Sequence, residues 1–144
     1  MPPIIYEKKD RIAFITINRP ERRNALSFEA FGLLAKAWLD FRDDPELWVA
    51  IITGAGDKAF CAGGDLKEMT ELRLTVPPRE MFPVPGDSIE LTKPTIAAVN
   101  GPAVGLGCVI PLYCDIRIAS PQAQFSAVFA RRGLIAEFGI AWML

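Results

Sequence analysis

Three short runs rich in Ile, Val and Ala, at residues 48–53, 95–99 and 115–119, most constrain the fold of this chain. Runs of this length and composition are typical of strands that a parallel sheet buries on both faces. Between these runs lie segments whose apolar residues recur at helical spacing, together with glycine-rich loops. The alternation of strand and helix therefore predicts an α/β fold with a largely parallel sheet.

The N-terminal part predicts a hairpin followed by a helix. Strand-forming residues at 4–7 and 12–17 flank a polar turn, which favours an antiparallel pair. Ser27 suits the N-cap of a helix to about Phe41, because apolar residues recur there at helical spacing. The Asp-Asp-Pro sequence at 43–45 ends that helix.

Shorter helices are expected at about 66–72 and from the glycine-rich segment 100–107 to about Tyr113. The proline-rich segment 76–86 should be irregular and mobile. Residues 138–144 are similar to the opening of an apolar helix without a polar stop signal. We therefore expect the chain to be a truncated part of a longer protein.

Composition excludes several classes of function. The 144 residues suit one domain spanning 1–144, and 16 Lys and Arg against 17 Asp and Glu leave a formal charge of −1. Without a basic excess, nucleic acid is not expected as a partner. The chain has no His, which excludes Ser-His-Asp catalysis, Cys-His catalysis and His-ligated metals. Proton transfer must then use carboxylates, Lys, Tyr or Cys.

The expected cellular location rests on three features that the sequence does not show: a CxxC pair, a secretory signal and a membrane span. Its three cysteines form no CxxC pair, which favours a reducing compartment over disulfides or a zinc site. No secretory signal is visible, so a cytoplasmic location is expected. Residues 94–114 carry no charge, but glycines and prolines divide them into a strand and a short helix. No membrane span is therefore expected.

Two glycine-rich segments, 62–65 and 104–107, have a chemical feature in common. Each follows a strand through a loop and leads into a predicted helix. Small residues let a ligand approach backbone N–H groups, and a helix N-terminus adds positive potential. Two such N–H groups facing one point would form an oxyanion hole. The alternative is that the glycines only permit tight turns and close packing.

Residues 54–59 match the looser dinucleotide fingerprint G-x-G-x-x-A after a strand. That fingerprint requires a helix that opens within the motif, and residues 60–64 are not helical in pattern. A plain turn is the better interpretation. A nucleotide-dependent oxidoreductase is the alternative that we rank last.

Four motifs occur in order along the chain, at 18–26, 58–69, 93–108 and 114–120: NRP…RNAL, KAFCAGGDLKEM, KPTIAAVNGPAVGLGC and CDIRIAS. Together they resemble the enoyl-CoA hydratase/isomerase (crotonase) superfamily over essentially the whole chain. The resemblance implies a spiral of ββα units that lacks the family's C-terminal helices, and an acyl-CoA substrate. It also implies a homotrimer or hexamer in the complete protein, with no metal or redox cofactor.

The resemblance assigns roles to individual residues. The backbone N–H groups of Gly64 and Leu106 would hold the enolate oxygen of a thioester. The coenzyme A site would consist of Arg23, Ala25, Ala62, Gly64, Asp65, Leu66 and Lys67, with Lys67 near the phosphate or adenine end. Asp65 is also explained as the N-cap of the following helix, and Lys67 as a solvated charge.

The two glutamates with which family hydratases hold and activate water are absent. Val109 and Phe129 occupy those positions beside the substrate, and neither side chain can move a proton. Glu137 falls where some family isomerases place their single carboxylate, and its apolar neighbours suit a proton shuttle. The alternative for Glu137 is an ordinary carboxylate at a helix N-terminus.

The sequence therefore predicts an acyl-CoA-processing enzyme that stabilises a thioester enolate, with double-bond isomerisation through Glu137 favoured. Two alternatives stay open. One is an enoyl-CoA hydratase-like lyase, and the other is a non-catalytic acyl-CoA-binding homologue.

Overall fold

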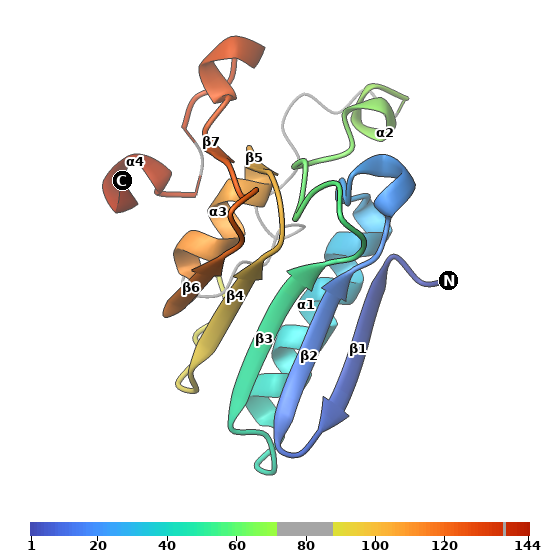
Figure 1. Ribbon diagram of the computed structural model, residues 1–144, viewed down its shortest axis with the longest axis vertical. Coiled ribbons are helices and arrows are strands. Elements are labelled where there is room, and N and C mark those ends of the chain that lie inside the picture. Colours follow the sequence, from blue (N-terminus) through green and yellow to red (C-terminus); the bar gives the residue numbers. More distant parts are fainter. Residues whose placement is uncertain (72–87, 137) are drawn as a thin grey trace.

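The computed structural model describes residues 1–71, 88–136 and 138–144 (Figure 1). Its elements are β1 (Ile4–Lys9), β2 (Ile12–Ile17), the 3-10 turn η1 (Pro20–Arg22), α1 (Phe28–Asp43), β3 (Val49–Gly54), α2 (Leu66–Glu71), β4 (Thr95–Val99), β5 (Ala103–Val104), α3 (Leu106–Tyr113), β6 (Ile116–Ala119), β7 (Phe125–Ser126), the 3-10 turn η3 (Phe129–Arg132) and α4 (Ile140–Met143). The expected irregular segment 76–86 lies outside the described residues, as does residue 72 at the end of the second expected helix.

The main sheet has the strand order β1-β2-β3-β4-β6. Strands β1 and β2 form the expected antiparallel hairpin, and β2, β3, β4 and β6 are parallel neighbours. One row across the sheet runs from Ile15 through Ile52 and Ala97 to Arg117. The prediction of a largely parallel sheet is confirmed.

Helix α1 forms where the apolar spacing predicts it and runs two residues beyond the expected end at Phe41. Ser27 is its N-cap, since its side chain accepts a hydrogen bond from the N–H of Ala30. At the other end, Lys93 Nζ donates to the carbonyl oxygens of Phe41 (2.8 Å) and Asp44. The lysine that precedes β4 therefore stabilises the C-terminus of α1.

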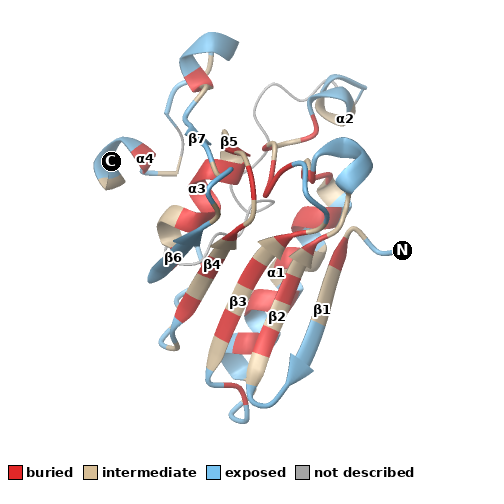
Figure 2. Ribbon diagram, viewed as in Figure 1, coloured by how far each residue is buried: buried red, intermediate tan, exposed pale blue. Residues whose placement is uncertain are grey.

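The central strands are buried mainly on one face. Burial alternates along β3 and β4, so that Ala50, Ile52 and Ala97 are buried whereas Ile51 and Ile96 are only half-buried (Figure 2). Helix α1 lies against one side of the sheet, where it contacts β1 and β2. The expectation that these strands are buried on both faces is therefore wrong for the described residues.

Strand β6 also differs from its prediction as a buried strand. All four of its residues are exposed, and Ile116 and Ile118 expose 50% and 62% of their surface. The cause is its position, because β6 is the last strand of the sheet and pairs with β4 alone among the described strands. The composition of β6 indicates that it forms a strand, but it does not indicate whether other elements bury that strand.

A second, narrower layer follows the carboxyl ends of β2, β3 and β4. Leu26 pairs with Gly64, Cys61 pairs with Ala103, and β5 pairs with β7, all in parallel. Each passage of the chain through the molecule thus adds one strand to the main sheet and a short extended segment to this layer. The glycine-rich segments 62–65 and 104–107 belong to this layer, since Gly64 and Val104 are among its paired residues.

The described part of the chain contains no helix that is long and apolar enough to cross a membrane.

Candidate functional site

The two glycine-rich segments lie side by side beyond the carboxyl ends of β3 and β4. A methyl group added to Gly63 would lie 2.9 Å from Val104 O and 3.5 Å from Leu106 N. One added to Gly64 would lie 3.8 Å from Leu106 Cδ1. Gly63 and Gly105 have φ values of +94° and +56°, which residues with a side chain rarely adopt. The glycines therefore serve both the turns and the close approach.

The amide of Gly64 points away from the chain segment that pairs with it. Leu26 N donates to Gly63 O (2.8 Å), and Asp65 N donates to Leu26 O (2.9 Å). Gly63 C=O and Gly64 N–H belong to one trans peptide unit and point in opposite directions. The Gly64 N–H is therefore turned to the side opposite Leu26.

The amide of Leu106 stands at the start of α3, where the first N–H groups have no acceptor inside the helix. Within the described part of the chain, neither the Gly64 N–H nor the Leu106 N–H donates to a protein acceptor. Two neighbouring segments thus each carry an N–H group that is available to an external acceptor, and the Leu106 N–H has the positive end of a helix behind it.

Cys61 directly precedes the first segment, pairs with Ala103 just before the second, and is fully buried. A methyl group on Gly107 would lie only 2.1 Å from Cys61 O, so α3 can approach this strand because residue 107 has no side chain. The Gly63 N–H donates to Cys61 Sγ (3.4 Å), but burial dominates and raises the pKa of the Cys61 thiol to about 12. Cys61 is therefore a packing residue and not a thiolate nucleophile.

Asp65, which we expected to line a ligand site, has its carboxylate directed into the protein. Its residue exposure is 7%, and its Oδ2 lies 3.0 Å from Arg19 Nη2 and 4.0 Å from Arg22 Nη2. Burial alone would raise the pKa of Asp65, but the hydrogen bonds from Arg19 and Glu68 N and the arginine charges hold it below its usual value. The Glu68 N–H contact, 3.5 Å from Oδ1, fits the N-cap interpretation.

Two asparagines that our sequence reasoning did not single out fix the loop after β3. Asn24 is fully buried, accepts from Arg19 N (2.9 Å) and donates to Ala55 O (2.9 Å) and Ala59 O (2.8 Å). Asn100 donates to the carbonyl oxygens of Gly54 and Gly56, each at 2.9 Å. For Asn100, its position directly after a predicted strand and before Gly101 was the available signal, whereas no local pattern marked Asn24.

The same loop contains the dinucleotide-like sequence 54–59. Residues 55–65 form bends and two isolated bridges but no helix, so the helix that the fingerprint requires is not there. The interpretation of this motif as a plain turn is confirmed.

Val109 and Phe129 belong to one buried apolar cluster, with exposed fractions of 1% and 5%. Cys108 and Ile140 complete its core, and Leu106 packs against it. Tyr113, at the edge of the cluster, donates its hydroxyl to Phe138 O (2.6 Å). The wall behind Leu106 is therefore apolar, and no carboxylate is among the residues that form it in the described chain.

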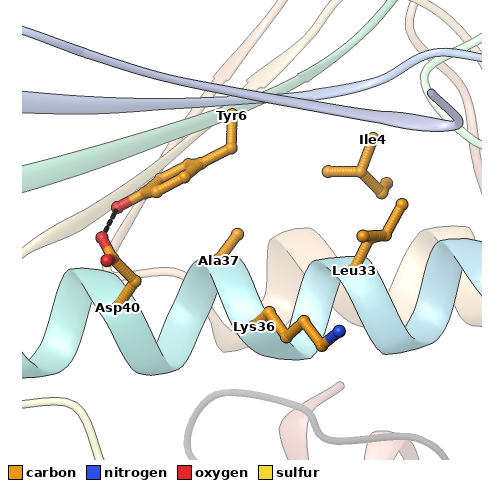
Figure 3. A pocket seen from close by; sticks show the side chains of 6 residues that line it. All are labelled: Ile4, Tyr6, Leu33, Lys36, Ala37 and Asp40. Carbon is orange, nitrogen blue, oxygen red and sulfur yellow. Dashed lines mark hydrogen bonds between the residues drawn. The ribbon is translucent and has the colours of Figure 1, made fainter. Parts of the chain in front are cut away.

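A separate shallow groove of about 270 Å³ lies between β1 and α1 (Figure 3). Its floor is apolar, and the Tyr6 hydroxyl donates to Asp40 Oδ2 (2.7 Å) at its rim. Lys8 pairs with Asp40 and Asp44, so these polar groups satisfy one another. Burial, followed by the hydrogen bond to Asp40, raises the pKa of Tyr6. None of the expected site residues lines this groove.

A family model described as enoyl-CoA hydratase/isomerase matches residues 7–144. The chain belongs to this family.

Individual relatives agree with the family match. The (E)-benzylidenesuccinyl-CoA hydratase of Thauera aromatica is 42% identical over 126 residues, which cover 85% of this chain and 49% of that protein. The short-chain-enoyl-CoA hydratase of Clostridium acetobutylicum is 40% identical, with 94% and 53% covered. The chain thus spans about half the length of the curated relatives it matches.

Solved structures confirm the crotonase-like spiral of ββα units. An enoyl-CoA hydratase from Mycobacterium tuberculosis superposes with a TM-score of 0.87 at 36% identity, and the match covers 100% of this chain and 56% of that one. A probable enoyl-CoA hydratase/isomerase from Mycobacterium abscessus gives 0.86 at 37% identity, with 99% and 55% covered.

The remaining expected site residues lie at the surface of this crotonase-like core. Arg23, Leu66 and Lys67 are exposed, whereas Ala25 and Ala62 are half-buried. Lys67 Nζ lies 3.8 Å from Glu71 Oε1 on an open helix face. The structure thus brings Gly64 and Leu106 together, and Val109 and Phe129 into one cluster. Glu137 lies outside the described residues.

Proposed function

We propose that this protein binds an acyl-CoA thioester and stabilises its enolate with the N–H groups of Gly64 and Leu106. The observation that carries the proposal is the pair of adjacent glycine-rich segments, in which the N–H groups of Gly64 and Leu106 donate to no acceptor in the described chain. Backbone donors fixed before the substrate arrives stabilise developing negative charge without reorganisation. Membership of a family of acyl-CoA enzymes supports this assignment.

The coenzyme A part of the substrate would contact Arg23, Ala25 and the segment 62–67. The exposure of Arg23, Leu66 and Lys67 leaves these side chains accessible to such a ligand. Asp65 would contribute through its backbone, since its carboxylate contacts Arg19. An assembly of three or six copies, which the family resemblance implies, is part of this proposal.

The reaction that we favour is a shift of the double bond from 3-enoyl-CoA to 2-enoyl-CoA. Glu137 would take a proton from the α-carbon, the two N–H groups would hold the dienolate oxygen, and Glu137 would return the proton at the γ-carbon. The apolar side chains of Val109 and Phe129 support this choice over hydration, because neither can hold or activate a water molecule. Hydration stays the second candidate, because the two curated relatives described above are named hydratases.

The experiment compares Leu106→Ala with Leu106→Pro in the full-length protein. Alanine keeps the N–H group and proline removes it, so the proline variant should lose about 10²–10³ in kcat while the alanine variant keeps measurable turnover. Substrates are a 3-enoyl-CoA and crotonyl-CoA, and deuterium exchange at the α-carbon gives a second measure of enolate formation. A folded proline variant with wild-type turnover and exchange would remove Leu106 from the site. Efficient water addition to crotonyl-CoA would favour the hydratase candidate.

A further inference from the structure

The segment 19–28 carries none of the proposed donors, yet it contacts the segment 62–68 at six points. Three contacts are between backbone groups: Arg23 O accepts from Ala62 N (3.0 Å), Gly63 O accepts from Leu26 N, and Leu26 O accepts from Asp65 N. Three involve side chains: Arg19 pairs with Asp65, Arg22 Nη2 lies 4.0 Å from Asp65 Oδ2, and Glu68 Oε2 accepts from Phe28 N (3.0 Å). We call this set of contacts the anchor.

One contact of the anchor sets the direction of a proposed donor. The hydrogen bond from Leu26 N to Gly63 O fixes the peptide unit to which the Gly64 N–H belongs. Since that unit is planar, any rotation of Gly63 C=O away from Leu26 turns the Gly64 N–H by the same angle. A carbonyl that accepts a hydrogen bond also polarises its own amide, which makes the N–H a stronger donor.

Arg19 and Asp65 clamp the two sides of that contact. Arg19 Nη1 donates to Ala25 O (2.6 Å), immediately before Leu26, while its Nη2 contacts Asp65, immediately after Gly64. The side chains of Arg19 and Asp65 are 18% and 8% exposed, so water screens the pair less than it screens a surface pair. The clamp therefore acts on the residues next to Leu26 and next to Gly64.

We propose that the ion pair between Arg19 and Asp65 is a positioning device for the Gly64 N–H. The Asp65 side chain is then a positioning group, which acts through the Gly63–Gly64 peptide, and its carboxylate does not touch the substrate. The proposal rests on the proposed function, because it assumes that the Gly64 N–H receives a thioester oxygen.

The test uses Asp65→Ala, which removes the clamp, and Asp65→Asn, which removes the charge and keeps one acceptor oxygen for either Arg19 or Glu68 N. Arg19→Lys keeps the charge but loses the two-pronged contact. Asp115→Ala is the matched control, because it removes the carboxylate that accepts hydrogen bonds from Thr95 N (2.7 Å) and Thr95 Oγ1 (2.8 Å) at the amino ends of β4 and β6. It should destabilise the protein at a place remote from the glycine-rich segments.

Three quantities are measured on the full-length protein: the melting temperature, kcat and KM with a 3-enoyl-CoA, and the carbonyl stretching frequency of a bound, unreactive acyl-CoA thioester. Asp65→Ala should lower kcat by about 10–10²-fold with KM changed less than about threefold, because a displaced donor loses part of its transition-state contact. The carbonyl shift on binding should shrink in parallel. Asp65→Asn and Arg19→Lys should fall between Asp65→Ala and the wild type.

The Asp115→Ala control should lower the melting temperature but leave the carbonyl shift and KM as in the wild type. A wild-type carbonyl shift and kcat in folded Asp65→Ala would overturn the positioning role. If Asp65→Ala does not fold, the same result in Asp65→Asn and Arg19→Lys would overturn it. If the wild-type protein itself binds the thioester without a carbonyl shift, the proposed function fails instead.

Discussion

From the close contact between Gly107 and Cys61, we predict how much stability the substitution Gly107→Ala removes. The added methyl carbon would lie 2.1 Å from Cys61 O, whereas ordinary contacts begin near 3.4 Å, so the difference of 1.3 Å must be taken up by movement. The obstructing atoms include backbone atoms, and Cys61 O already accepts from Val104 N (2.9 Å). We therefore expect a loss at the upper end of the range for overpacking, about 3 kcal/mol. For a chain of this length, that lowers the melting temperature by about 10 °C.

The same displacement should affect the proposed site. Gly107 follows Leu106 directly, so movement of α3 away from Cys61 moves the Leu106 N–H away from Gly64. A misplacement of about 1 Å costs on the order of 10²-fold in rate. Thermal and urea unfolding measure the first effect, and turnover of a 3-enoyl-CoA at a temperature where the variant is folded measures the second.

Gly32→Ala is the matched control for this substitution. Gly32 lies within α1, and a methyl group there would meet nothing within 4 Å. Alanine should therefore stabilise the helix by about 0.5–1 kcal/mol without an effect on turnover. A Gly107→Ala protein as stable as the wild type, in the same unfolding assay, would refute the close approach of α3 to Cys61.

Three further predictions follow from individual side chains. If Glu137 moves the proton, Glu137→Gln should lower isomerase turnover and α-carbon deuterium exchange by about 10²–10⁴ with little change in coenzyme A affinity, and unchanged rates would remove Glu137 from the reaction. The lowered pKa of Asp65 means that its contribution to stability is complete above its unfolded pKa of about 3.9 and is lost as pH falls through the folded value. Urea unfolding of wild type and Asp65→Asn should therefore differ most at neutral pH and converge below about pH 4, and a constant difference would contradict the ion pair. Because burial raises the pKa of the Cys61 thiol to about 12, iodoacetamide should modify Cys61 at pH 8 only after unfolding, and rapid labelling of the native protein would contradict its burial.

Much of the fold could be predicted because its signals are local. Ser27 and the apolar spacing that follows it determine where α1 begins, and the residues at 4–7 and 12–17 determine the hairpin. Such patterns report the conformation of a segment and one of its faces. They do not report which segment lies next to it, and for that reason the exposed position of β6 was not predicted.

From the sequence, we could identify the candidate site residues that act through a backbone N–H group. We could not identify the residues that act through a contact between distant side chains. Glycine-rich segments before helices indicated Gly64 and Leu106 because glycine itself makes the N–H groups accessible. Arg19 and Asp65 are 46 positions apart in the sequence, and nothing in either local pattern indicates that they meet. Asn24 likewise contacts Ala55 and Ala59 through the fold alone.

In the proposed site, the residues that place the N–H donors differ from the residues that could transfer a proton. One set can therefore change without the other. An N–H group needs no particular side chain, so the placement of Gly64 and Leu106 depends on Gly63, Gly105 and Gly107 and on the anchor beneath them. None of these determinants requires a carboxylate at residues 109 and 129. Val109 and Phe129 therefore leave the proposed N–H pair in place and supply no group that can move a proton. In the proposed function, proton transfer would fall to a residue outside the apolar cluster around Leu106.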